Sequence, residues 1–179
     1  MPTNLLKKYP ELLEILHLNE YERIKSLRAI FDRDIQNNPD FKFRTKQIFP
    51  IKTDGEIDMS RQFKHLTCEE IFEEDEAGRM IPKRVFEKDR SQRLHWIKVH
   101  VNETYPPKIE VFSIIERDEK KRKDVTRTYI YDKKEKYIIV LEPLRVCTAY
   151  FLLTAYYLNK PYAEKQMKKK LKKKLVEVL

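Results

Sequence analysis

Four runs of aromatic and β-branched residues near the end of the chain constrain its fold most. They are KIEVFSIIE (108–116), TRTYIYD (126–132), KYIIVLEP (136–143) and TAYFLLTAYYL (148–158). Runs of this composition, separated by charged residues or proline, are typical of neighbouring β-strands. The charged segment 118–124 between the first two predicts a turn. We therefore expect an α+β fold in which a four-stranded antiparallel β-meander packs with helices.

A pair of N-terminal helices is expected before the sheet. Pro10 predicts the start of the first, and Leu12, Leu13 and Leu16 form its apolar edge. Asn19, with Glu22 three residues later, forms a capping-box pattern that starts the second. The buried stripe of that helix would comprise Ile24, Leu27, Phe31 and Ile35. We expect the pair to pack on the sheet; the alternative is a separate arm that binds a partner.

Weaker signals lie between these helices and the meander. Residues 41–51 alternate loosely, as a strand does, and residues 53–55 predict a turn. Thr67 and Glu70 form a second capping-box pattern, which predicts a short helix. Its segment 69–76 carries six acids and no base. A solvated helix face is the simpler interpretation, and a cation site or a mimic of nucleic acid is the alternative.

A longer helix is predicted between Pro82 and Asn102. Its apolar face would comprise Val85, Phe86, Leu94, Ile97 and Val101. Steps of three or four residues place a second set along one stripe of the helix. This set is a row of hydrogen-bond donors with one imidazole: Arg84, Lys88, Ser91, His95, Lys98 and Asn102. We expect the stripe to face solvent or a substrate.

The charge of the chain is uneven. The net charge is +9 and the sequence pI is near 9.4, which favours partners that carry phosphate. Residues 160–179 hold eight lysines and two glutamates, and so contribute +6. A basic C-terminal helix is expected after Pro161, with Met167, Leu171, Leu175 and Val178 on its apolar edge. It can attract phosphate or dock on the core, and the two roles are compatible.

The composition of the chain argues against several other classes of function. Only two glycines occur in 179 residues, which excludes glycine-rich phosphate loops. Cys68 and Cys147 have no paired motif, so we predict no zinc site, no other metal and no cofactor. The apolar runs are too short to span a bilayer and no signal peptide is evident, so we predict a cytoplasmic protein without a membrane partner. One compact unit is expected, from a helical region (1–80), a core (81–160) and a basic helix (161–179).

The predicted sheet and helix hold the groups for metal-independent RNA cleavage. That reaction needs a base, an acid and fixed positive charge. His95 is the candidate base or acid, Arg127 would stabilise the phosphorane, and Thr154 and Tyr156 would bind phosphate or position the base. The structural alternatives are an interfacial histidine and strand residues selected for β-propensity. Further substrate contacts are expected from Lys98, Arg84, Lys88, Tyr129 and Arg145.

Residues 86–158 also resemble a known group of nucleases. RLHWIK (93–98) on a helix, the meander and the last strand YFLLTAYYL (150–158) are similar to the barnase–EndoU–colicin–RelE superfamily, especially its members on phages and other mobile elements. The resemblance implies a ribonuclease, often a toxin held off by an immunity protein or antitoxin. It implies catalytic roles for His95, Arg127, Thr154 and Tyr156. The strands hold no second histidine, so Tyr156 or Lys98 would supply the other proton transfer.

Two functions follow from these patterns. The first is a ribonuclease that cleaves RNA by attack of the 2′-hydroxyl. The second is an accessory protein that binds nucleic acid or a partner and has the same fold without the reaction. Only the first requires the four catalytic candidates to meet in one open cleft.

Overall fold

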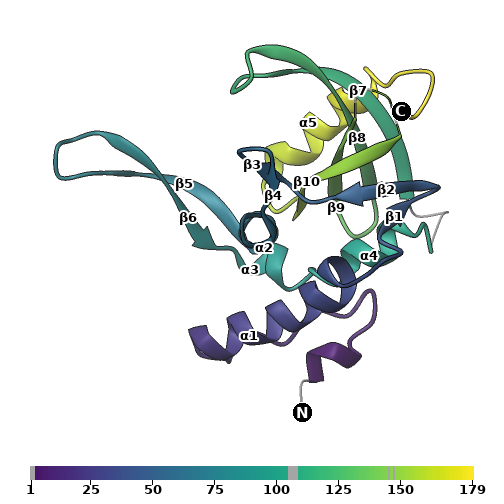
Figure 1. The fold of residues 1–179 in the computed structure, drawn as a ribbon. Coiled ribbons are helices and arrows are strands. Elements are labelled where there is room, and N and C mark those ends of the chain that lie inside the picture. The colour runs from purple at the N-terminus through teal and green to yellow at the C-terminus, as the bar shows by residue number, and fades with distance from the viewer. Residues whose placement is uncertain (1–2, 105–108, 145, 147) are drawn as a thin grey trace.

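The computed structural model describes residues 3–104, 109–144, 146 and 148–179. At its centre is a six-stranded mixed sheet with the strand order β1-β2-β10-β9-β8-β7 (Figure 1). The strands of this sheet are β1 (Lys42–Phe43), β2 (Lys46–Phe49), β7 (Ile109–Asp118), β8 (Lys123–Asp132), β9 (Tyr137–Pro143) and β10 (Ala149–Tyr157). Two separate hairpins are β3 (Lys52–Thr53) with β4 (Glu56–Ile57) and β5 (Cys68–Glu74) with β6 (Met80–Phe86).

Most of the helices are short. They are η1 (Thr3–Leu6), α1 (Glu20–Phe31), the π-helical η2 (Asp32–Gln36), α2 (Met59–Thr67), α3 (Lys88–Ser91), α4 (Trp96–Val101) and α5 (Pro161–Leu171). Within the described ranges, none is long and apolar enough to cross a membrane.

The predicted four-stranded meander was wrong as a description of the sheet. Strands β7 to β10 are antiparallel neighbours, but the sheet continues past β10 to β2 and β1. The β10–β2 pair is parallel and places Ala149 opposite Gln47 and Phe151 opposite Phe49. Parallel strands need a long connection. Because the two strands lie far apart in the sequence, no local pattern indicates that they pair.

The N-terminal helical pair was also wrong, because residues 10–16 are not helical. Leu13 and Ile15 are fully buried, whereas Leu12 and Leu16 are exposed. This alternation is typical of an extended segment, not of a helix. The second member of the pair exists as α1, and its capping box between Asn19 and Glu22 is confirmed.

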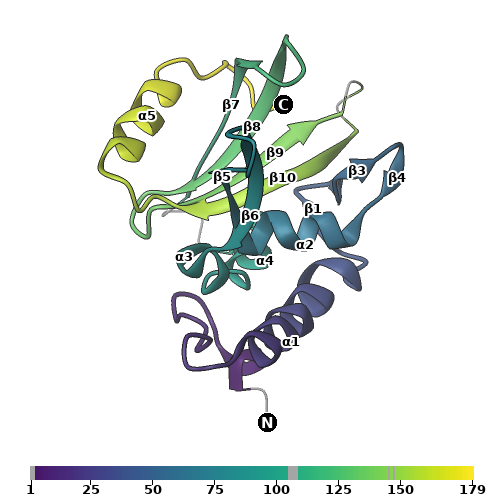
Figure 2. The ribbon, with the colours of Figure 1, turned by 90° about the vertical axis from the view of Figure 1, so that its left-hand side faces the viewer.

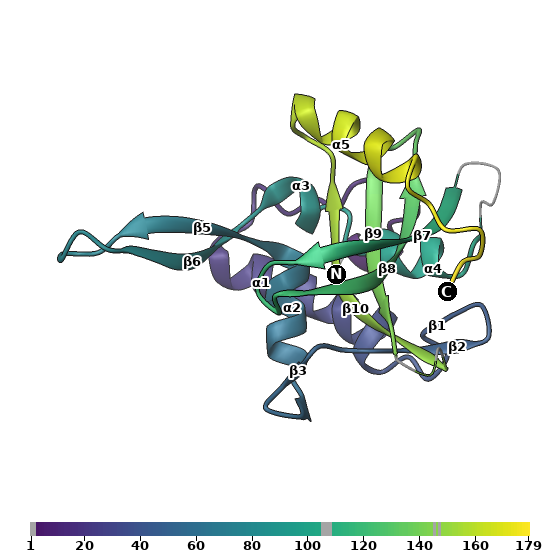
Figure 3. The same ribbon diagram turned by 90° about the horizontal axis from the view of Figure 1, so that it is seen from above.

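The long helix between Pro82 and Asn102 was wrong for a similar reason. Its first residues form β6, which pairs with β5 in a hairpin that projects from the body (Figures 1 and 3). Both strands of an isolated hairpin are edge strands, where the missing N–H of a proline is tolerated. Glu87 then caps α3, a turn follows, and α4 begins after His95. The stripe of donors is therefore divided among a strand and two short helices.

The acidic segment 69–76 lies on the same hairpin, so its predicted helix was wrong. Thr67 is the last residue of α2 instead of a cap, and Asp58 caps that helix by accepting the N–H of Arg61. Glu73 pairs with Lys83 across the two strands. Thus the acids are residues of an exposed β-ribbon.

Both faces of the sheet are covered (Figure 2). The first face packs against the N-terminal segment, α1, α2 and α4, and Trp96 and Phe31 are its largest fully buried contributions from helices. The second face packs against α5 through Met167 and Leu171. The basic C-terminal helix ends at Leu171, so the predicted apolar edge stops there.

After α5, the chain reaches β7, which is an edge strand of the six-stranded sheet. Leu175 donates its N–H to the carbonyl of Ser113. The carbonyl of Leu179 then accepts hydrogen bonds from the hydroxyls of Thr128 (2.8 Å) and Tyr150 (2.7 Å). Since Tyr150 belongs to the first face, the segment after α5 passes from one face to the other.

A buried group of hydrogen bonds joins the N-terminal segment, α4 and β8. Asp132 is fully buried, and one of its oxygens accepts from the Tyr9 hydroxyl (2.6 Å) and from His100 Nε2 (3.0 Å). The other ring nitrogen of His100 lies 2.7 Å from the Trp96 carbonyl oxygen, so both ring nitrogens have a partner. Burial opposes ionisation of Asp132, but the hydrogen bonds from His100, the Glu135 N–H and Tyr9 hold its pKa below the ordinary value.

The variant Asp132→Asn is expected to lower the free energy of unfolding by about 3 kcal/mol or more, because it removes the buried carboxylate that faces the Tyr9 hydroxyl and His100 Nε2, and each hydrogen bond to a charged group is worth about 1.5–3 kcal/mol. Tyr9→Phe removes one hydrogen bond to a charged group and should cost about 1.5–3 kcal/mol. Urea unfolding at pH 7 measures both. Folding lowers the pKa of Asp132, so its contribution is complete above the ordinary value of 3.8 and is lost as the pH falls through the folded value. A variant as stable as the wild type at pH 7 would contradict the role of these hydrogen bonds.

Candidate functional site

The four catalytic candidates do not meet in one cleft. His95 precedes α4, is 3% exposed, and lies among residues of the first face. Arg127 shares the second face with Tyr129 by strand alternation, and Tyr156 packs on that face as well. The hydroxyl of Thr154 points to the carbonyl of His65 at 3.5 Å. The structure therefore places the imidazole and the guanidinium on opposite sides of the sheet.

His95 and Lys98 do meet, in a pocket of about 410 Å³ that we call the His95 pocket. Lys7, Lys8, Arg33 and Asp34 also line it. They come from the N-terminal segment and η2, so the spacing around His95 carries no signal of them. Both ring nitrogens of His95 are buried without a hydrogen bond from the residues that the structure describes. Burial lowers the pKa of His95 to about 4, so the ring is neutral at pH 7.

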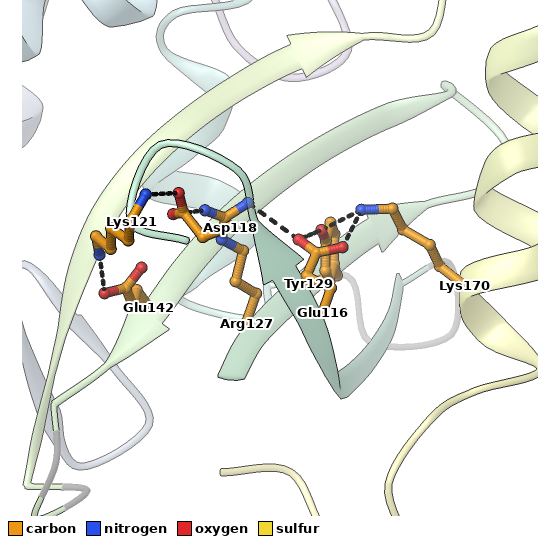
Figure 4. Close-up of polar contacts among 7 residues, drawn as sticks. All are labelled: Glu116, Asp118, Lys121, Arg127, Tyr129, Glu142 and Lys170. Carbon is orange, nitrogen blue, oxygen red and sulfur yellow. Dashed lines mark hydrogen bonds and ion pairs between the residues drawn. The ribbon is translucent and has the colours of Figure 1, made fainter. Parts of the chain in front are cut away.

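Arg127 belongs to a network of charged side chains on the second face (Figure 4). Its Nη1 donates to Glu116 (3.0 Å) and its Nη2 donates to Asp118 (2.7 Å). Glu116 also accepts from the Tyr129 hydroxyl (2.7 Å) and from Lys170 Nζ (2.5 Å), which lies on α5. Burial opposes ionisation of Glu116, but these hydrogen bonds lower its pKa.

The charges of this network cancel. The three acids Glu116, Asp118 and Glu142 face the three bases Arg127, Lys121 and Lys170. A phosphate at Arg127 would have to displace two carboxylates. Burial raises the pKa of Tyr156 to about 12, so this hydroxyl stays protonated at neutral pH. The network fastens α5 to the sheet, and both terminal nitrogens of Arg127 are engaged by carboxylates.

The other predicted substrate contacts are scattered. Arg84 lines a second pocket of about 440 Å³ with His65 and pairs there with Glu70 at 3.6 Å. Burial, with nearby Arg84 and Arg61, lowers the pKa of His65 to about 4. No sequence pattern singled out His65, because its neighbours come from α2, β5, β6 and the β7–β8 turn. Lys88 is exposed on α3, Tyr129 lies in the charged network, and Arg145 falls outside the described residues.

The outer side of α5 presents a different kind of surface. Met167 is 2% exposed and, with Leu171, fixes the inner side of this helix on the sheet. A helical period then turns four side chains outward. Three lie on α5 and the fourth is its C-cap residue: Lys165, Lys168, Lys169 and Lys172, which we call the lysine surface. All four are exposed and have no ion pair within the described part of the chain.

Comparison with known proteins finds no relative of this chain. No protein family, no curated protein and no solved structure matches this chain. Among the residues that the structure describes, no three or more His, Cys, Asp or Glu side chains are grouped so that they could hold a metal ion.

The buried imidazole predicts a pH dependence of stability. The pKa of His95 falls from 6.5 in the unfolded chain to about 4 in the fold, so protons bind the unfolded state more tightly. Stability should therefore fall as the pH drops from 6.5 to about 4, by about 3 kcal/mol for this group. His95→Gln should remove much of this slope, and His65 should account for part of the remainder. Urea unfolding between pH 7 and pH 4.5 measures it, with His17→Gln, at an exposed position, as the control. Equal slopes in wild type and His95→Gln would contradict the buried, neutral ring.

Proposed function

We propose that this protein binds nucleic acid without cleaving it, and that the lysine surface contacts the phosphates. The observation that supports this most is the docking of α5. Its apolar side and Lys170 are held on the sheet, so the outward lysines project from a fixed helix.

The charge balance of α5 favours the same function. The acid within the helix, Glu164, is engaged by Lys136 of the β8–β9 turn. Thus the four lysines face solvent, and none of them forms an ion pair among the described residues. Contacts between lysine and phosphate depend on salt and carry no base sequence information. The proposal is therefore binding along a nucleic-acid backbone, without base readout.

The ribonuclease interpretation and the superfamily resemblance stay predictions. The separation of His95 from Arg127 favours the accessory role, because transfer of a proton and stabilisation of the phosphorane must occur at one phosphate. An immunity protein or antitoxin as partner belongs to the ribonuclease interpretation. The binding assay below includes a direct test of cleavage.

The first experiment measures how tightly a fluorescent single-stranded RNA binds at several salt concentrations. The triple variant Lys168→Gln, Lys169→Gln, Lys172→Gln should bind more weakly. The slope of log K against log salt should become shallower by about 2, since each phosphate contact on a single strand contributes about 0.7. The matched control is Lys25→Gln, Lys52→Gln, Lys64→Gln, which removes the same charge from exposed positions on α1, β3 and α2.

The control decides whether binding is local. Equal loss of binding in the two triple variants would show that only net charge matters and would contradict the assignment to α5. Absence of salt-sensitive binding in the wild type would end the proposal. The same samples, incubated with total RNA and EDTA beside His95→Ala, report cleavage on a gel. Cleavage by the wild type that is lost in His95→Ala would favour the ribonuclease instead.

A further inference from the structure

The His95 pocket plays no part in the proposed binding of nucleic acid by α5. It lies among residues of the first face, whereas the lysine surface lies on a helix that covers the second. Residues 7–9, η2 and α4 supply most of its wall. Its volume of about 410 Å³ is within the range of small-molecule sites, about 300–1,000 Å³.

The fixed charges at this pocket favour an anion. Arg33 and Asp34 form a two-point ion pair, with both N–O distances at 2.7 Å, and so largely cancel. Lys7 is engaged by Glu14 at 2.6 Å. Two cations remain: Lys98, whose nearest acid is Asp34 at 3.8 Å, and Lys8, whose ammonium has no acid partner among the described residues. These two lysines can neutralise the negative charge of a bound ligand.

His95 supplies the second observation. The side chain is 97% buried by area, and both ring nitrogens lack a hydrogen bond from the described residues. A buried polar group left unsatisfied costs about 1–3 kcal/mol, so its presence calls for an explanation. The Glu11 carbonyl lies near the ring and accepts from Trp96 Nε1 at 3.0 Å. A neutral imidazole carries one N–H donor and one acceptor nitrogen, and neither has a partner in hydrogen-bonding geometry among the described residues.

We propose that the His95 pocket binds the phosphate group of a small phosphomonoester, which accepts a hydrogen bond from His95 and is neutralised by Lys8 and Lys98. Two cations and one neutral donor match a dianion better than a single carboxylate. His95 lines the pocket, both of its ring nitrogens are buried, and rotation about the broad χ2 torsion of histidine would turn one toward the phosphate. Val99 and the ring of Tyr9 offer apolar wall to the organic part of the ligand.

The test titrates the full chain with inorganic phosphate and with adenosine 5′-monophosphate. Calorimetry gives the affinity, and two-bond ¹H–¹⁵N spectra follow the His95 ring. The wild type should show saturable binding and a shift of the His95 signals. Lys8→Met and Lys98→Met should each weaken binding by about tenfold or more, the scale of one charge-assisted hydrogen bond. Both positions lie at the surface or are half-buried, so these variants keep the fold.

Controls separate the pocket from general attraction. Lys25→Met, at an exposed position on α1, should bind both probes as the wild type does. His95→Gln is compared only if its circular dichroism matches that of the wild type; the lysine variants decide the outcome otherwise. A pocket filled by water alone would give no saturable binding and no shift of His95. That result, or full binding in both Lys8→Met and Lys98→Met, would overturn the proposal.

A second arm distinguishes two sources of the phosphate. A single-stranded RNA with a 5′-phosphate competes with adenosine 5′-monophosphate if the pocket receives the end of a nucleic acid. It competes no better than the same RNA with a 5′-hydroxyl if the natural ligand is a free small molecule. The triple variant of the lysine surface should bind adenosine 5′-monophosphate unchanged, and Lys98→Met should keep the salt slope of RNA binding. Thus the two proposals can fail independently.

Discussion

The carboxylate of Asp132 is the contact on which the arrangement of the first face depends. It is removed from water, so it must be hydrogen-bonded within the protein. His100 and Tyr9 do this from α4 and from the N-terminal segment. Because both partners are held at one buried point, the segment that carries Lys7 and Lys8 is fixed beside α4. The walls of the His95 pocket follow from that placement.

Charged side chains are arranged differently on the two faces of the sheet. On the second face, Glu116 accepts hydrogen bonds from Arg127, Tyr129 and Lys170. The two cations are therefore neutralised within the network, and Lys170 holds α5 on the sheet. The lysines that remain on α5 point outward. On the first face, Lys8 has no acid partner among the described residues, and Lys98 lies 3.8 Å from Asp34, which Arg33 engages more closely. Both lie beside a histidine whose ring nitrogens make no hydrogen bond with the described residues. Cations that can attract an anion therefore occur at two separate places, the lysine surface and the His95 pocket.

The segment 82–102 shows where local patterns mislead. Steps of three and four residues there fit a helix, yet its first part pairs with β5 and His95 lies between two short helices. Periodicity shows which residues would share a face if the segment were one helix. The pairing of β6 with β5 and the cap at Glu87 decide where strand and helix actually form. The same limit applies to Arg127, whose type predicted a phosphate contact. In the sequence, one carboxylate partner, Glu116, ends a strand run and the other, Asp118, begins a charged segment, and neither position indicates a contact with Arg127.

The sequence by itself determined the features that neighbours along the chain control: the strands β7 to β10, the capping box at Asn19, and the division of α5 into an apolar and a lysine side. Each depends on residues within a few positions, where side-chain alternation, helical period and capping act directly. Only the tertiary structure decided the parallel pairing of β10 with β2, the burial of His95 and the neutralisation of Arg127. These depend on contacts between distant segments, whose energies are set by packing and desolvation and leave no periodic mark in the sequence.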